Sequence, residues 1–123
     1  GLSKNVVITK PTLKINNLYH DSFLVVNLSK RPEGFGRTIS EALSSAKPII
    51  APNQGGTKEQ LYNFDKKLLF NVNSYSSFLR AFKYVIKNHQ LISKKGRKFV
   101  KKNYSSDLMC KKTLEVYNYV VNQ

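Results

Sequence analysis

Short runs of apolar residues recur along the chain, and each is bounded by polar or turn-forming residues. Residues 23–26 and 48–51 are apolar on both faces, which is typical of buried parallel strands. The β-branched run at residues 6–9 ends before Pro11, and a last short apolar run lies at residues 68–70. The pattern therefore predicts about four strands, at residues 6–9, 23–26, 48–51 and 68–70.

Helical periodicity fills the segments between and after these runs. The clearest helix is expected from about Arg37, because apolar residues there repeat at i, i+3, i+4 and i+7. A less regular helix is expected over residues 12–20 with Thr12 as its cap, and a short one is expected to be capped by Thr57. Helices are expected from Ser74 to the end, with Phe78, Phe82, Val85 and Ile86 on one face.

Strands that alternate with helices predict an α/β fold, a Rossmann-like parallel sheet with flanking helices. The whole chain, 1–123, is expected to form a single domain. Ligands of such sheets bind beyond the carboxyl ends of the strands. The loops at residues 29–36 and 52–56 each follow a strand, so both should open on the same edge. We expect Glu33, Glu41 and Gly55 to face one cleft there.

Composition narrows the class of protein. Hydrophobic residues make up 41% of the 123 residues, as in a soluble globular fold. The one cysteine, Cys110, cannot form an internal disulfide, so a reducing, cytoplasmic compartment is expected. No apolar run approaches the roughly 20 residues that a membrane-spanning helix needs. His20 and His89 are isolated, so no metal site is expected.

The chain is strongly basic, with a formal net charge of +14. No acidic residue occurs between Asp65 and Asp107, a stretch rich in lysine. Three interpretations remain open: a compositional bias with a solvated helix surface, then an acidic membrane surface as partner, and last a nucleic acid. Lysine far outnumbers arginine, which disfavours a nucleic-acid-binding protein, because proteins that recognise bases and phosphates usually use arginine.

One segment combines features of an anion site with two carboxylates. Gly34 and Gly36 let the backbone approach a ligand, and the helix from Arg37 presents free N–H groups and its positive end at the same place. Glu33 and Glu41 flank this point, and a carboxylate can accept two hydroxyls of a sugar or ribose. Gly-x-Gly alone is a weak pattern, and neither a third glycine nor a P-loop lysine is present.

The order and spacing of a longer set of residues add specificity. Glu33 and Glu41 stand at a Glu-x7-Glu spacing within a Glu-Gly-Phe-Gly…Glu-Ala segment. A small-residue stretch, a Lys-Pro-Ile-Ile strand and then Gly55-Gly56-x-x-Glu59 follow. Residues 23–59 thereby resemble the donor-site signature of glycosyltransferase family 4, the group 1 glycosyltransferases, which have the GT-B fold. The resemblance implies the later part of the C-terminal, nucleotide-sugar-binding domain of a retaining hexosyltransferase.

The resemblance also implies residue roles. Glu33, the catalytic candidate, would bind hydroxyls of the donor sugar near the reacting centre, and Glu41 would bind the ribose. Amides around Phe35, Gly36, Arg37 and Thr38 would face the diphosphate of the nucleotide-sugar, which is the donor substrate, with no metal or other cofactor. Arg37 departs from the aliphatic residue usual there; pairing with Glu41 or exposure to water is favoured over contact with phosphate. The implied donor-binding set is Glu33, Gly34, Phe35, Gly36, Arg37, Thr38, Glu41, Gly55 and Gly56.

The resemblance further implies a role in glycan, lipopolysaccharide or capsule synthesis, at or near the inner face of a membrane. The acceptor-binding domain and the first strands of the donor domain would then lie outside this chain. An open sheet edge is expected in consequence, and it should pair in a homodimer or with an upstream domain. The alternative is a basic module, on a degenerate donor-domain fold, that binds nucleic acid or acidic membrane.

Overall fold

The computed structural model describes all of residues 1–123 and confirms the predicted α/β class. A three-stranded parallel sheet has the order β1-β2-β3, with β1 at Val25–Val26, β2 at Ile49–Pro52 and β3 at Leu69–Phe70. The connections between the strands contain α2 (Arg37–Ser44) and α3 (Gly55–Asp65). Sheet order follows chain order, so right-handed crossovers place both helices on one face.

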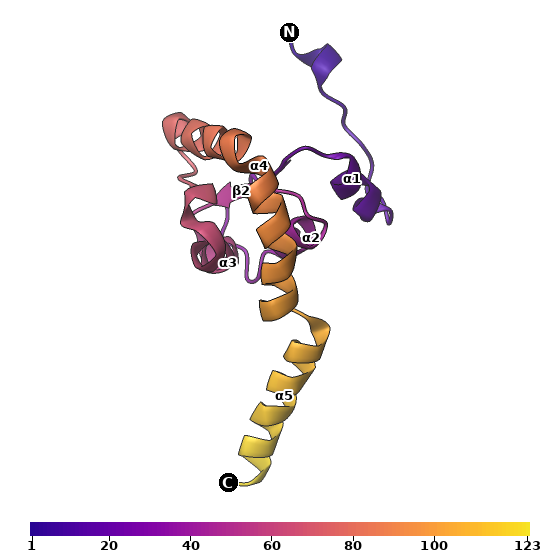
Figure 1. The fold of residues 1–123 in the computed structure, drawn as a ribbon, viewed down its shortest axis with the longest axis vertical. Coiled ribbons are helices and arrows are strands. Elements are labelled where there is room, and N and C mark those ends of the chain that lie inside the picture. The colour runs from indigo at the N-terminus through magenta and orange to yellow at the C-terminus, as the bar shows by residue number, and fades with distance from the viewer.

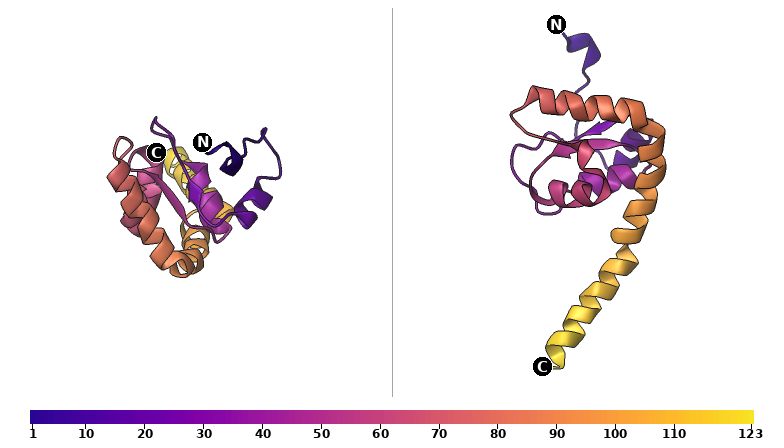
Figure 2. Two further views of the ribbon diagram at one scale, coloured as in Figure 1. Left: turned by 90° about the horizontal axis from the view of Figure 1, so that it is seen from above. Right: turned by 60° about the vertical axis from the view of Figure 1, so that its left-hand side comes forward.

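The other face of the sheet is covered by the first half of α4, Tyr75–Asn103 (Figure 2, right). The side chain of Ser74 caps α4 by accepting a hydrogen bond from the Ser77 amide. The helix bends at Asn88, whose backbone is not helical, and its second half packs against α2. The two helices are close at Gly96, where a Cβ would lie 2.9 Å from the end of the Leu43 side chain.

The hydrophobic core lies between these layers. It comprises 15 buried residues, from Tyr19 on α1 (Ile15–Asp21) to Val100 on α4. All of β2 is buried because it has a strand on each side and helices above and below. The apolar stripe predicted for α2 is confirmed: Ile39, Ala42 and Leu43 are fully buried.

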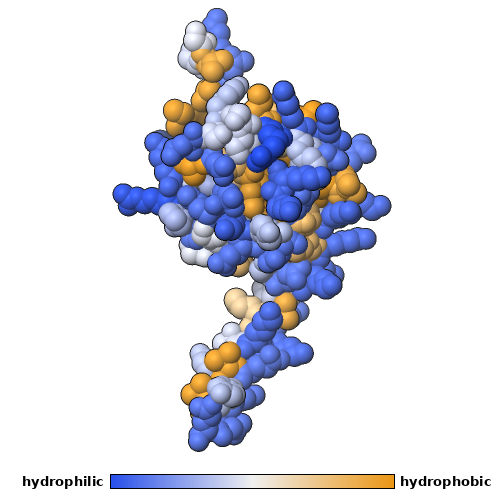
Figure 3. Space-filling view, turned by 90° about the vertical axis from the view of Figure 1, so that its left-hand side faces the viewer, coloured by the Kyte–Doolittle hydropathy of each residue, from blue (hydrophilic) through white to orange (hydrophobic).

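The chain outside this core is extended at both ends. Residues 1–14 are all exposed, with only the 3-10 helix η1 (Ser3–Asn5) in them. Helix α5 (Ser106–Val121) has no buried residue and projects from the body, so the two termini lie far apart (Figure 1). Hydrophobic side chains are visible along this projecting helix at the bottom of Figure 3.

Three of the strand predictions need correction. The run at residues 6–9 is not a strand, and Val7 and Ile8 are 85% and 94% exposed. A strand needs a neighbour to satisfy its backbone, and none lies beside this run. The sheet therefore has three strands rather than four. The strand predicted at residues 23–26 shortens to β1, and Val26 is 37% exposed because β1 is an edge strand.

Two helix starts also differ in detail from the sequence patterns. The first helix begins at Ile15, because the Thr12 hydroxyl accepts the Lys14 amide in a turn before it. Thr57 is not a cap: α3 begins two residues earlier, and the Thr57 hydroxyl hydrogen-bonds to carbonyls of the preceding turn. Residues 66–68 form the 3-10 helix η2 (Lys66–Leu68), so the strand predicted at residues 68–70 shortens to β3. On α4, Val85 is buried, whereas Phe82 and Ile86 are exposed.

Candidate functional site

The loop from β1 to α2 and the start of α3 meet at the carboxyl edge of the sheet. The amide of Gly56 donates to the carbonyl of Glu33 at 2.8 Å. A Cβ on Gly55 would lie 2.6 Å from that same oxygen. A Cβ on Gly56 would lie 2.4 Å from the Gly34 carbonyl oxygen and 2.6 Å from Phe35. Two glycines thus let backbone pack directly on backbone, and the expectation that Glu33 and Gly55 share one edge is confirmed.

A run of amides in this loop has no acceptor within the protein. The N–H groups of residues 34–38 donate no hydrogen bond to backbone or side chain. Gly36 caps α2 in the left-handed region, with φ of +74°, and a Cβ there would lie 3.0 Å from the Thr57 methyl group. Gly34, Phe35 and Arg37 are exposed, Thr38 is half-buried and Gly36 is buried. Free amides at the positive end of a helix can bind an anion.

The carbonyls of the same loop are held by a residue that the sequence patterns did not single out. The side-chain nitrogen of Gln60, on α3, donates to the carbonyl of Gly36 at 3.2 Å and also to the carbonyl of Phe35. Gln60 is only 2% exposed. Thr57, Gln60, Leu61 and Phe64 repeat at i, i+3, i+4 and i+7, so the glutamine occupies a core-facing position of α3. A polar residue at a core-facing position of a predicted helix is the sequence feature that could have identified Gln60.

Glu33 is oriented by a second residue that the patterns missed. The Asn27 side chain, 7% exposed at the end of β1, donates to Glu33 Oε1 at 3.2 Å. The other end of the Asn27 amide accepts the Ser29 amide at 2.8 Å. One carboxylate oxygen of Glu33 is therefore fixed, while Oε2 lies 3.5 Å from the place where a Cβ on Gly36 would be. This places the Glu33 carboxylate beside the run of free amides.

Glu41 is held from two sides. Its Oε2 accepts the Tyr19 hydroxyl at 2.9 Å, and its Oε1 pairs with Arg37 at 3.1 Å. The Arg37 side chain is 85% exposed and the Glu41 side chain 34%, so the favoured pairing of Arg37 with Glu41 is confirmed, in contact with water. Burial, followed by the hydrogen bond to Glu41, raises the pKa of Tyr19 to about 12. Tyr19 is a further residue that the sequence reasoning did not place at the site.

The exposed ring of Phe35 packs edge-on against Tyr104 at the end of α4, with 5.5 Å between ring centroids. Burial, with a smaller effect of Glu59, raises the pKa of Tyr104. These two rings border a surface hollow of about 360 Å³ that extends to Leu108 and Met109 on α5. The loop is thereby tied to α4 by an aromatic contact and to α3 by hydrogen bonds.

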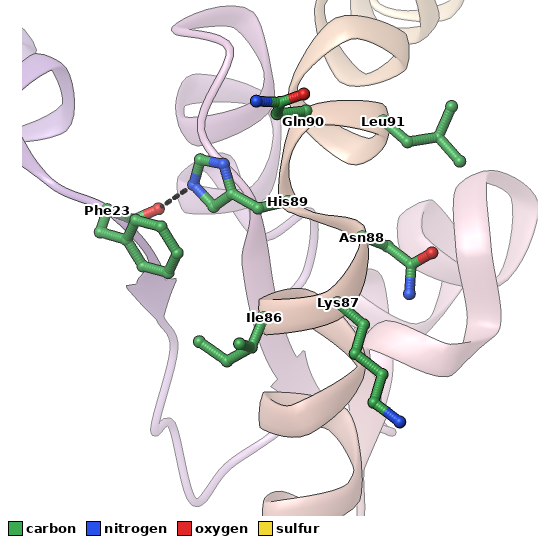
Figure 4. Close-up of a pocket in the computed structure, with 7 residues that line it drawn as sticks. All are labelled: Phe23, Ile86, Lys87, Asn88, His89, Gln90 and Leu91. Atoms are coloured by element: carbon green, nitrogen blue, oxygen red, sulfur yellow. Dashed lines mark hydrogen bonds between the residues drawn. The ribbon is translucent and has the colours of Figure 1, made fainter.

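None of the five cavities in the structure is lined by Glu33 or Glu41. The predicted common cleft for Glu33, Glu41 and Gly55 is therefore not a cavity of this chain, because no element faces the loop from the solvent side. The largest cavity, about 520 Å³, lies at the bend of α4. There His89 stacks on Phe23 and donates to its carbonyl at 2.8 Å, whereas Lys87, Asn88 and Leu91 point away from this pair (Figure 4).

No group of three or more histidine, cysteine, aspartate or glutamate side chains lies together in the structure. No helix is both long and apolar enough to cross a membrane. His20 is exposed and contacts Asp21, and His89 has the stacking role described above.

Comparison with known proteins places the chain in a family. Residues 1–106 match the family model described as glycosyl transferases group 1. The chain belongs to this family. It also resembles the crystal structure of a glycosyltransferase from Rickettsia africae ESF-5, with 30% sequence identity and a TM-score of 0.79. The alignment covers 89% of this chain and 30% of that one, so the chain spans about a third of the length of that relative. No curated protein sequence matches the chain.

Proposed function

We propose that this chain binds the nucleotide-sugar donor of a retaining glycosyltransferase of family 4, as part of the C-terminal domain of a GT-B fold. The observation that carries the proposal is the run of free amides at residues 34–38, flanked by the carboxylates of Glu33 and Glu41 at one helix start. This arrangement offers donors for a diphosphate and acceptors for sugar hydroxyls within one segment. Membership of the group 1 family supports it.

The diphosphate is assigned to the amides. When the bond between the anomeric carbon and the diphosphate oxygen breaks, negative charge develops on the departing oxygen. Preorganised N–H groups at the positive end of α2 stabilise that charge. Electrostatic stabilisation of this kind is usually the largest single contribution to catalysis. The same charge can be met in this way without a metal ion, and we expect none to be required.

The two carboxylates are assigned to the two sugars of the donor. Glu33 lies beside the amides and is assigned to the hydroxyls of the transferred sugar near the reacting carbon. Glu41 lies one turn further into α2 and is assigned to the ribose. Arg37 is exposed, so a ribose hydroxyl can replace it on Glu41 Oε1 while Tyr19 keeps Oε2 in place. Hydrogen bonds to a charged group are worth about 1.5–3 kcal/mol each.

Binding of nucleoside diphosphates to matched variants tests these roles. Ligand-observed NMR with UDP, GDP and ADP should detect one preferred nucleotide with a dissociation constant of roughly millimolar, about 4 kcal/mol. Glu41→Ala should weaken binding of the free nucleotide tenfold or more, because the ribose is part of it. Glu33→Ala should have a smaller effect, because the free nucleotide lacks the transferred sugar. Equal effects of the two substitutions would refute the assignment.

A second candidate function has its own observation. The eight basic side chains of α4 between residues 83 and 102 are exposed, and none forms an ion pair. Exposed basic side chains that reach an anionic lipid surface contribute about 1 kcal/mol each to binding. This would hold the protein at the cytoplasmic face of a membrane, near a lipid-linked glycan, lipopolysaccharide or capsule precursor. Cosedimentation with anionic but not neutral vesicles, lost in moderate salt, would support this role; equal binding to both would exclude it.

A further inference from the structure

Gln60 occupies an unusual position for an amide side chain. It is nearly fully buried on α3, and its nitrogen donates to two successive carbonyls of the β1–α2 loop, those of Phe35 and Gly36. Its own side-chain oxygen is buried without a hydrogen-bond partner. An unsatisfied buried oxygen costs about 1–3 kcal/mol. A polar side chain kept in the core at such a cost often marks a functional constraint.

The geometry of the peptide unit connects this contact to the proposed diphosphate site. In a planar trans peptide, the carbonyl of one residue and the N–H of the next point in opposite directions. The peptide units whose carbonyls Gln60 holds therefore end in the N–H groups of Gly36 and Arg37. Both N–H groups are among those that have no acceptor in the protein. The Gly36 carbonyl also accepts the Ile39 amide at 3.0 Å, whereas Gln60 is the protein donor to the Phe35 carbonyl. By drawing both carbonyls toward α3, Gln60 turns both amides away from α3.

We propose that Gln60 is a positioning residue for the donor diphosphate: it fixes the two peptide units that aim the Gly36 and Arg37 amides at the phosphate oxygens. This inference rests on the proposed function and deepens it. Gln60 itself touches no ligand. Its effect is preorganisation, because amides that are already oriented need not reorganise when charge develops.

The alternative is that Gln60 only fastens the loop to α3. That role would be shared by Gln54, whose side-chain nitrogen donates at 3.2 Å to the carbonyl of Ser29 earlier in the same loop. The peptide unit that begins at Ser29 lies outside the run of free amides at residues 34–38. Gln54 therefore provides a matched control, with the same side chain and the same kind of bond to a different peptide unit.

The test uses the ¹⁵N-labelled 123-residue protein and inorganic pyrophosphate, a probe that does not depend on the base or the sugar. In salt near physiological strength, pyrophosphate should shift the Gly36 and Arg37 amide resonances of the wild type. In Gln60→Met, which keeps the length of the side chain but has no donor, affinity should fall about tenfold and the two amides should already be displaced without ligand. In Gln54→Met, affinity should change less than twofold.

Each outcome decides between the two roles. Wild-type affinity in Gln60→Met overturns the inference and leaves the proposed function standing. Equal losses of affinity in the two methionine variants show that Gln60 only fastens the loop, which also overturns the inference. Absence of any pyrophosphate shift at Gly36 and Arg37 in the wild type overturns the proposed function together with the inference. If Gln60→Met does not fold, Gln60→Glu is measured instead. It retains shape and length but presents oxygens to the two carbonyls, and it should bind as weakly; wild-type affinity there overturns the inference.

Discussion

Gly56→Ala tests the packing of α3 on the β1–α2 loop. The new Cβ would lie 2.4 Å from the Gly34 carbonyl oxygen and 2.6 Å from the backbone of Phe35. Carbon–oxygen contacts in proteins are normally about 3.3–3.6 Å. The loop must therefore retreat by about 1 Å, because the atoms in the way are backbone and cannot rotate aside.

The energetic result is a balance of two terms. Overpacking of this kind costs about 1–3 kcal/mol, and alanine within a helix recovers about 1 kcal/mol relative to glycine. The difference lowers the free energy of unfolding of Gly56→Ala by about 0–2 kcal/mol, toward the upper end because the atoms in the way are backbone. Pyrophosphate affinity should fall at least tenfold, since a displacement of about 1 Å in a positioned group can cost a factor of about 10².

Urea denaturation followed by circular dichroism measures the stability, and two other glycines provide controls. Gly34→Ala has nothing within 4 Å of its new Cβ, so its stability should stay within about 0.5 kcal/mol of the wild type. Gly96→Ala meets the flexible end of the Leu43 side chain, and the gain in helix propensity should offset that contact. Wild-type stability and wild-type loop resonances in Gly56→Ala would refute the described packing.

Further predictions address other parts of the chain. Ala46, just after α2, has a positive φ of 56°, a conformation that glycine adopts more easily than alanine. Ala46→Gly should raise the free energy of unfolding in urea by about 1 kcal/mol, and a decrease would contradict the assigned conformation. Ser74→Ala should cost about 1 kcal/mol in urea denaturation, since it removes the α4 cap. Neutral Tyr19, with its pKa raised to about 12, contributes stability that is complete below pH 10 and is lost as the pH rises through about 12; Tyr19→Phe should lose less stability over that window in an alkaline titration. Sedimentation equilibrium should show self-association at high concentration, because β1 has a free edge, and a strict monomer would count against it.

The sequence was most informative where local pattern and burial agree. Helix α2 was predictable because its apolar spacing and the glycine before it both mark its start and its buried face. The meeting of Glu33 and Gly55 was predictable because parallel strands carry their following loops to one edge. The strand prediction at residues 6–9 was wrong because β-branched residues favour a strand only where a neighbouring strand is present to pair with, and none lies beside this run.

The parts of the site that the sequence did not indicate depend on contacts between distant segments. Tyr19 meets Glu41 from 22 residues away, and Gln60 meets the loop from 24 and 25 residues away. Neither lies in a recognisable motif, because a hydrogen bond between two such segments leaves no spacing rule in the sequence. Asn27 is only six residues from Glu33 in the sequence. That its side-chain amide points toward Glu33 follows from where β1 ends, which the sequence pattern did not define.

The central claim is that residues 33–41 and the start of α3 bind a nucleotide-sugar. Mapping of amide shifts on the ¹⁵N-labelled protein, titrated with UDP-, GDP- and ADP-sugars in salt near physiological strength, tests it most directly. We predict saturable shifts for one nucleotide class, concentrated at the amides of residues 34–38, with smaller shifts at Gly55 and Gly56. Shifts confined to the lysines of α4, equal for all three nucleotides and abolished by salt, would contradict the account.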